Sequence, residues 1–452
     1  MPGATLSRWT MSYFAAALSC LVAGLILTAS GFGYPSTAIE APESLVVIHL
    51  LAIGWLGLLF AGSLLQFVPV LVSRPLEMPH LSLPVLLLTI TGLGLLLAGF
   101  LGLAGILPLW SWVLPLGGAV LALAFAGLLW MVTRTLATAR PMPLPAKFVA
   151  LGCAALVGVA ASGLLLTLPL SGLTANQYLV GLLLEAAPSH AYLGLVGWMT
   201  ITAIGVSYRL LTMFLLSPER PRMTSRAVGW LMAVGLAMVA FGTVLAGAGT
   251  SPTATIYVAT AFGGIAVLIY GLDVHLIFRE RKRKSAEMNV LASLAAVAML
   301  IACFALFGAS TMSDLPIDLA RPAAYLFVFG WLTGLGLGQL YKIVAFMTWL
   351  ECYGPVLGRA AVPRVQELVN ERRSSTWFLL YFGATVAATV ALIADTPAMF
   401  RWLALAQLAA VCALAFEFAQ ARRLAIVPQA VRLPKGAIHP RLFLPSFKGS
   451  SQ

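Results

Sequence analysis

Charged residues are scarce in this sequence. Asp, Glu, Lys and Arg make up only 9% of the 452 residues, whereas 61% are hydrophobic. A soluble domain carries about a quarter charged residues, so a water-soluble globular fold is excluded. Histidine and cysteine are also rare, with five of each, and no two cysteines form a CxxC pair. A disulfide framework is therefore not expected. No phosphate-loop, dinucleotide-binding or zinc-protease motif stands in a context that gives it meaning.

Long apolar runs are what the sequence has in abundance. Twelve of them are long enough to cross a bilayer as helices. They cover 11–32, 44–72, 82–104, 109–133, 146–170, 187–216, 226–248, 254–278, 288–309, 321–349, 374–394 and 398–420. Because a helix satisfies its own backbone polar groups without water, we expect an all-α integral membrane protein with twelve transmembrane helices. The lipid bilayer is then its first partner.

Basic residues are distributed unevenly between the two sets of loops. If the N-terminus lies inside, only two of the 27 basic residues, Arg321 and Arg401, fall outside. The loop after the eighth span, which is then inside, carries a basic cluster from Arg279 to Lys284. The positive-inside rule therefore places both termini inside. The net charge of +12 reflects this topology and attraction to anionic headgroups. Since the charges are dispersed, no nucleic-acid partner is expected.

A Gly-Trp motif occurs three times, in the second, sixth and tenth spans. The pairs are Gly54-Trp55, Gly197-Trp198 and Gly330-Trp331, and seven residues after each tryptophan comes Gly62, Gly205 or Gly338. We infer three related four-helix units, 1–145, 146–286 and 287–421. Repeats with an even number of spans favour a pseudo-threefold arrangement about an axis along the membrane normal. The glycines let helices pack closely around that axis.

The two ends of the chain need separate interpretations. Arg8 and the apolar run after it also suit a cleaved signal peptide, but the threefold repeat favours a retained first span. Residues 422–452 are basic and punctuated by proline. We expect them to form an extended cytoplasmic tail.

Two histidines are the candidate ligands for a cofactor or metal. His49 lies near the outer end of the second span, and His190 opens the sixth at the same depth. An ionisable residue in a membrane span is a functional candidate by default, and imidazole commonly binds haem iron and copper. His49 stands six residues before its tryptophan, where the other units have Tyr192 and Tyr325, but His190 stands eight before. The offset of two residues rotates a side chain by about 200° around the helix axis, so His49 and His190 are not equivalent positions. A purely structural role in helix packing therefore stays open for both.

A second candidate site is a polar inner ring, found eleven residues after each tryptophan. Its members are Gln66, Arg209 and Lys342, and Asp273 lies at similar depth, where it could pair with either cation. One interpretation is an anion site or proton entrance of a permease for a small solute. The other is snorkelling of the basic side chains to the inner headgroups. The three tryptophans and the cysteines Cys20, Cys153 and Cys303 are interpreted as packing residues.

The twelve spans, the three four-helix units and the outer histidine of the second span resemble subunit I of the haem-copper oxidases. They also resemble the related nitric oxide reductases and the NnrS-like membrane proteins. The segment HAYLGLVGWMTITAIGVSYRLLTMF, which begins at His190, is similar to the H…GW…G..Y.L.P segments of that superfamily. The resemblance implies a haem axial role for His49 and a copper-ligand role for His190. It also implies the plasma (inner) membrane and respiratory subunits or a cytochrome as partners.

The sequence departs from this family at most of its metal ligands. The family also needs two histidines on the seventh span and two on the tenth, and here both spans have none, with Tyr325 standing where a ligand is sought. A haem-copper dioxygen or nitric oxide centre therefore cannot be assembled. We expect a divergent member without oxidase catalysis that binds haem b, copper or neither, in respiratory or nitric oxide metabolism. A permease and a non-catalytic scaffold subunit are the alternatives.

Overall fold

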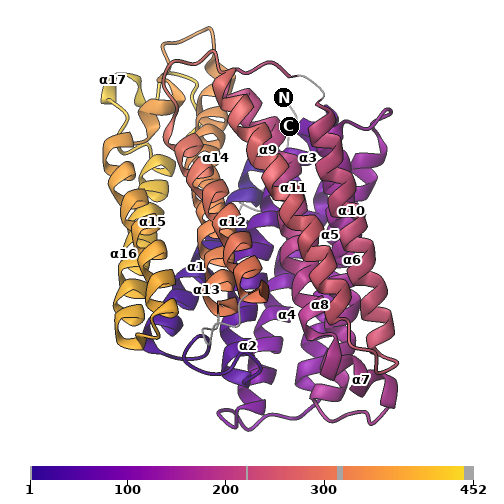
Figure 1. The fold of residues 1–452 in the computed structure, drawn as a ribbon. Helices are drawn as coiled ribbons and strands as arrows, with labels where there is room; N and C mark the ends of the chain where they lie inside the picture. The colour runs from indigo at the N-terminus through magenta and orange to yellow at the C-terminus, as the bar shows by residue number, and fades with distance from the viewer. Residues whose placement is uncertain (1–2, 220–221, 313–318, 442–452) are drawn as a thin grey trace. The chain divides into compact units, whose positions relative to one another are not determined.

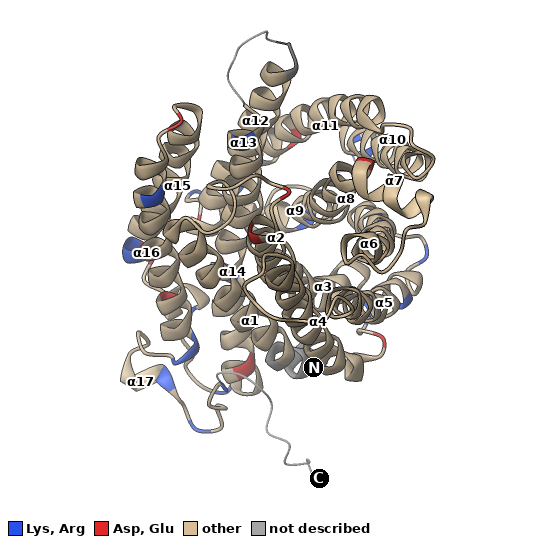
Figure 2. Cartoon of the chain, turned by 90° about the horizontal axis from the view of Figure 1, so that it is seen from below, with Lys and Arg blue, Asp and Glu red and all other residues tan. Residues whose placement is uncertain are grey.

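The computed structural model describes residues 3–219, 222–312 and 319–441, and it is helical throughout. No described residue belongs to a β-strand, and twelve helical spans are long and apolar enough to cross a membrane. The predicted twelve-span, all-α fold is therefore confirmed. The spans run over Trp9–Ser30, Pro42–Val72, Pro79–Leu103, Val113–Ala137, Leu144–Leu170, Ala187–Leu215, Met223–Ala246, Thr253–Arg279, Met288–Ser310, Ala320–Val356, Glu371–Ile393 and Pro397–Arg422. Figure 1 follows these helices, and Figure 2 shows how few charged residues they carry.

The helices group by their contacts into two compact units. Unit 1 comprises Met1–Gly31, Trp55–Gln66 and Ala286–Gln452, and unit 2 comprises Phe32–Gly54 and Phe67–Ser285. This grouping follows packing, not sequence repetition, so it differs from the three segments inferred from the Gly-Trp motif. The pseudo-threefold arrangement and the sidedness of the termini stay predictions.

Unit 2 is built mainly from helix pairs that are adjacent in sequence. The closest are α4 with α5 and α10 with α11, while α6 packs on both α5 and α9. Glycine makes the first pair possible: a Cβ on Gly117 of α5 would lie 2.5 Å from the backbone nitrogen of Leu96 on α4. The bounds are α2 Pro42–His49, α4 Ser82–Leu103, α5 Val113–Ala137, α6 Leu144–Leu170, α7 Gln177–Glu185, α8 Ala187–Tyr192, α9 Ile201–Leu215, α10 Met223–Ala246, α11 Thr253–Arg279 and the 3₁₀ turn Pro79–Leu81.

Unit 1 brings the first helix of the chain against the last span. Helix α1 packs on α16 and α14, and α15 packs on α16. Gly31 at the end of α1 faces Arg401 at the start of α16, so these helices are antiparallel. The bounds are α1 Gly3–Ser30, α12 Met288–Met312, α13 Ala320–Tyr325, α14 Gly334–Tyr353, α15 Glu371–Ile393, α16 Pro397–Arg422, α17 Gln429–Arg432, and the 3₁₀ turns Gly354–Val356 and Val365–Leu368; α3, Leu58–Val72, begins in unit 1 and ends in unit 2.

All three Gly-Trp segments adopt the same uncommon backbone. Leu50–Gly57, Leu193–Thr200 and Leu326–Thr333 are π-helical, eight residues each, with the tryptophan in the sixth place. π-helical turns are rare and usually occur singly within α-helices. The repeat read from the sequence therefore extends to the local backbone of these three spans. The tryptophans themselves are buried: Trp55 and Trp331 expose none of their surface and Trp198 exposes 2%.

The described part of the C-terminal tail folds back onto unit 1. Leu424 and Val427 are buried against Cys352 and Tyr353, and the Tyr353 hydroxyl donates to the carbonyl oxygen of Arg432 at 2.8 Å. The expectation of an extended arm was therefore wrong for residues up to 441. Leu424 and Val427, which precede the first proline of the tail, are buried although the tail as a whole is basic. Residues 442–452 lie outside the described chain.

Candidate functional site

The two candidate ligand histidines lie in the same unit, on different helices. His49 is the last residue of α2, and His190 lies in the short helix α8. Both belong to unit 2 and both are partly buried. The structure therefore places both histidines in one compact unit, and their joint binding of one ligand stays a prediction.

The ring of His49 is oriented by its own helix. Its Nδ1 atom lies 2.8 Å from the carbonyl oxygen of Leu45. A carbonyl can only accept a hydrogen bond, so Nδ1 must carry the proton. Nε2 then holds the lone pair of the neutral imidazole. The ring of Phe100 on α4 lies against it, with 4.9 Å between the ring centres.

The ring of His190 is oriented by α6. Its Nδ1 atom lies 2.9 Å from the hydroxyl oxygen of Ser162, and that hydroxyl donates its single hydrogen to the carbonyl of Gly158 at 2.7 Å. With its hydrogen on that carbonyl, the Ser162 oxygen accepts from Nδ1–H, and this arrangement leaves the His190 lone pair on Nε2. Gly163 provides the space, because a Cβ at that position would lie 3.0 Å from Cε1 of His190.

Both histidines thus have the arrangement typical of metal-ligating histidines. Such residues usually donate one ring N–H to a carbonyl, carboxylate or water and bind the metal through the other nitrogen. Within the described residues, no three or more His, Cys, Asp and Glu side chains are grouped so that they could hold a metal ion. His49 and His190 are thus the two nitrogen donors that remain as candidates in this part of unit 2.

The tyrosines equivalent to His49 take other partners. Tyr192 donates its hydroxyl hydrogen to the carbonyl of Ala259 at 3.1 Å, within unit 2. Tyr325 donates to the side-chain oxygen of Gln407, within unit 1. Both tyrosines bridge neighbouring helices, so the equivalent position serves helix packing in the second and third repeats.

The members of the predicted polar ring each find a partner nearby. Arg209 forms an ion pair with Glu219 in unit 2, and Lys342 forms one with Glu287 in unit 1 at 2.6 Å. Gln66 accepts a long hydrogen bond of 3.5 Å from Thr10. Because Arg209 belongs to unit 2, and Gln66 and Lys342 to unit 1, the ring itself stays a prediction.

Asp273 does not take the ion-pair partner suggested for it within unit 2. It is fully buried and accepts hydrogen bonds from the Tyr208 hydroxyl at 2.8 Å and the Thr224 hydroxyl at 2.6 Å. The possible pairing with Arg209 is not formed, since the Arg209 guanidinium pairs with Glu219 in the loop after α9. Hydrogen bonds from two hydroxyls stabilise the buried carboxylate in its place.

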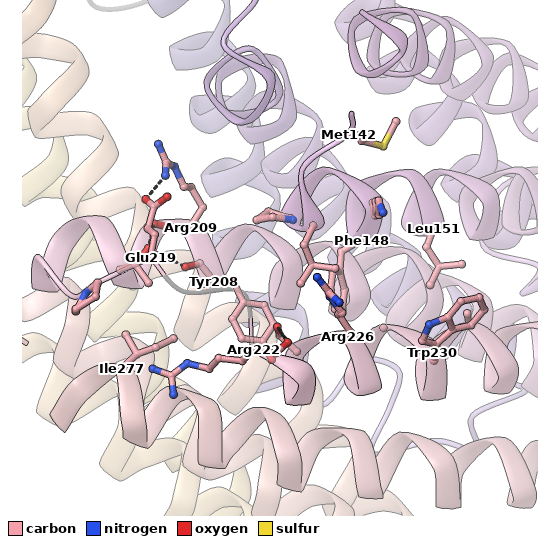
Figure 3. A pocket seen from close by; sticks show the side chains of 18 residues that line it. Met142, Phe148, Leu151, Tyr208, Arg209, Glu219, Arg222, Arg226, Trp230 and Ile277 are labelled. Carbon is pink, nitrogen blue, oxygen red and sulfur yellow. Dashed lines mark hydrogen bonds and ion pairs between the residues drawn. The ribbon is translucent and has the colours of Figure 1, made fainter. Parts of the chain in front are cut away.

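A cavity of about 700 Å³ opens between the ends of α6, α9, α10 and α11 in unit 2. Its lining contains four basic side chains and one acidic side chain, namely Lys147, Arg209, Arg222, Arg226 and Glu219. Figure 3 shows Arg226 beside Phe148 in the middle of the group, with Trp230 beyond them. Of this basic cavity, only Arg209 was among the predicted site residues.

The sequence contained partial signals for the residues that it did not assign. Arg222 and Arg226 stand four residues apart at the start of α10, and Lys147 stands near the start of α6. Ser162 and Gly163 look like ordinary small residues of a transmembrane helix. Which spans are neighbours cannot be read from one sequence, and that knowledge is what joins these residues into sites.

No protein-family model matches the chain, and no curated protein matches it. The fold alone defines its class, which is that of multi-pass α-helical membrane proteins.

Proposed function

We propose that this protein is a divergent relative of haem-copper oxidase subunit I that binds one haem iron or one copper ion through His49 and His190. The observation that supports this is the orientation of the two rings: both Nδ1 atoms hold hydrogens that are already donated. His49 and His190 lie in the same unit, and each keeps an Nε2 lone pair that makes no hydrogen bond to a described residue, which favours a Lewis acid as their partner.

Of the two ions, haem iron suits the donor set better. A porphyrin would supply its own nitrogen donors, so His49 and His190 would be sufficient as protein ligands. A copper ion would need further ligands besides His49 and His190, because no third His, Cys, Asp or Glu of the described residues is grouped with them. A b-type haem held in this way would supply one-electron transfer. The chain's own contribution would be to fix both tautomers through Leu45 and Ser162, and to cover one ring with Phe100.

The cellular setting follows from the same resemblance. We place the protein in the plasma (inner) membrane, in respiratory or nitric oxide metabolism, next to respiratory subunits or a cytochrome. Oxidase catalysis is not part of the proposal, because the seventh and tenth spans contain no histidine. Tyr325, which stands in the tenth span, donates its hydroxyl hydrogen to the side-chain oxygen of Gln407.

Absorption spectroscopy and elemental analysis of the purified protein test this proposal. We expect a Soret band, or copper in equimolar amount, in the wild type. His49→Ala and His190→Ala should each lose most of the signal. His275→Ala is the matched control, because His275 is exposed near the end of α11 and belongs to neither site. A wild-type protein that contains neither iron nor copper after expression with supplemented haem and copper would refute the proposal.

A further inference from the structure

We propose that the basic cavity of unit 2 is a binding site for the phosphate group of an anionic phospholipid. The cavity lies at one end of the unit, formed by the starts of α6 and α10 and the ends of α9 and α11. The positive-inside rule assigns that end to the inner leaflet, where anionic headgroups attract basic side chains. This site is separate from the histidine pair and independent of the function proposed for it.

Two of its cations are available to a ligand. Arg209 is paired with Glu219, and Arg222 is paired with Glu280 at 2.8 Å. Lys147 and Arg226, by contrast, have no ion-pair partner in the described chain. The side-chain hydrogen bond of Arg226 among the described residues goes to the sulfur of Met223 at 3.8 Å. Both cations are exposed. An anion that enters between them gains two charge-assisted hydrogen bonds without breaking an existing ion pair.

The helix ends add to the positive potential of the cavity. Helices α6 and α10 both start at its rim, neither has a side-chain cap, and neither has an acidic residue in its first turn. Unsatisfied N–H groups and the helix dipole make such an end favourable for a negative charge. The N-termini of α6 and α10 lie at the same cavity as Lys147 and Arg226. The backbone and the side chains therefore both favour a negative charge there.

The wall beyond the charges is apolar, which favours a lipid over a soluble anion. The lining includes Phe148 and Leu151 of α6 and Trp230 and Ala233 of α10, of which Figure 3 labels the first three. Trp230 lies seven residues into its helix, roughly 10 Å below the rim, and is 74% exposed. Tryptophan prefers the headgroup level of a bilayer. A ligand that matches the whole cavity therefore has an anionic head and a hydrocarbon tail.

Binding to the delipidated full-length protein in neutral detergent tests the proposal. Titration with phosphatidylglycerol, phosphatidylcholine and inorganic phosphate is followed by native mass spectrometry and by the midpoint of thermal unfolding. We expect phosphatidylglycerol to bind more tightly than phosphatidylcholine. Lys147→Gln and Arg226→Gln should each weaken its binding about fivefold. Arg134→Gln is the matched control, since Arg134 is an exposed cation at the end of α5 outside the cavity lining.

A second variant separates the lipid from a free anion. Ala233→Phe fills the apolar wall and leaves the basic rim unchanged, so it should weaken phosphatidylglycerol binding and leave any inorganic phosphate binding as it was. Equal affinity of the wild type for phosphatidylglycerol and phosphatidylcholine would overturn the proposal. So would unchanged binding in the Lys147→Gln/Arg226→Gln double variant. The proposal is also contradicted if inorganic phosphate raises the midpoint of thermal unfolding and Ala233→Phe leaves phosphatidylglycerol binding unchanged. Those two results together would indicate a site for a soluble anion.

Discussion

Ser162→Ala is the variant that separates a ligand role of His190 from a packing role. Ser162 holds the Nδ1–H of His190 at 2.9 Å and passes its own hydrogen to the carbonyl of Gly158 at 2.7 Å. Alanine removes this acceptor without adding volume. Nδ1–H then has no partner on α6, and the tautomer that leaves Nε2 free is no longer fixed.

The expected size of the effect follows from this geometry. Removing the acceptor that orients a ligating histidine typically lowers metal affinity by about 10- to 100-fold. A neutral hydrogen bond contributes only about 0.5–1.5 kcal/mol to stability, so the fold should persist. Helix α6 keeps its packing on α5 and α9 in this variant.

The assay is a titration of the metal-free protein with haem and, separately, with copper, followed by the absorption change. Ser162→Thr keeps the hydroxyl and should retain near wild-type affinity. Ser171→Ala is the control, because Ser171 also donates to a helix carbonyl, that of Leu168 at 2.9 Å, but contacts no histidine. If Ser162→Ala binds haem and copper as tightly as the wild type, Ser162 does not orient a ligating imidazole and His190 serves packing alone.

Three further predictions address the same spans. Gly163→Ala pushes a methyl group against His190, so haem or copper affinity should fall while the twelve-span fold is kept, as judged by spectral titration and circular dichroism. Glu351→Gln leaves the buried Arg422 guanidinium without its carboxylate. It should lower the free energy of unfolding of unit 1 in detergent by about 3–5 kcal/mol. Glu219→Gln, at an exposed ion pair, should lower it by about 1 kcal/mol or less. Trp55→Phe and Thr333→Val should show a coupling energy of about 1 kcal/mol in a double-mutant cycle, because the Trp55 indole donates to the Thr333 hydroxyl at 2.9 Å.

The fold could be predicted from the sequence because hydropathy acts locally. Each span is long and almost free of charge, and the bilayer leaves the helix as the simplest way to satisfy its backbone. The twelve observed spans therefore begin and end within a few residues of those expected. The three Gly-Trp segments are also π-helical in the structure, which nothing in the residues themselves predicts.

The sites could be predicted only in part because they depend on which helices are neighbours. His49 and His190 attracted attention as isolated ionisable residues in apolar spans, and the structure places both in unit 2. Ser162 could not be identified as the partner of His190, since 28 residues and a helix reversal separate them. Asp273 was named as a possible partner of Arg209 or Lys342 because of its charge and depth, but two hydroxyls donate to its carboxylate. Opposite charge at similar depth is a weak guide to pairing.

X-ray absorption spectroscopy at the iron or copper edge tests the central claim most directly. If His49 and His190 bind the ion, the wild-type spectrum should contain the scattering of two imidazole ligands. His190→Ala should retain one, and Ser162→Ala should show a longer or more disordered second ligand. A bound metal whose spectrum contains no imidazole, or is identical in the wild type and His190→Ala, would contradict the account.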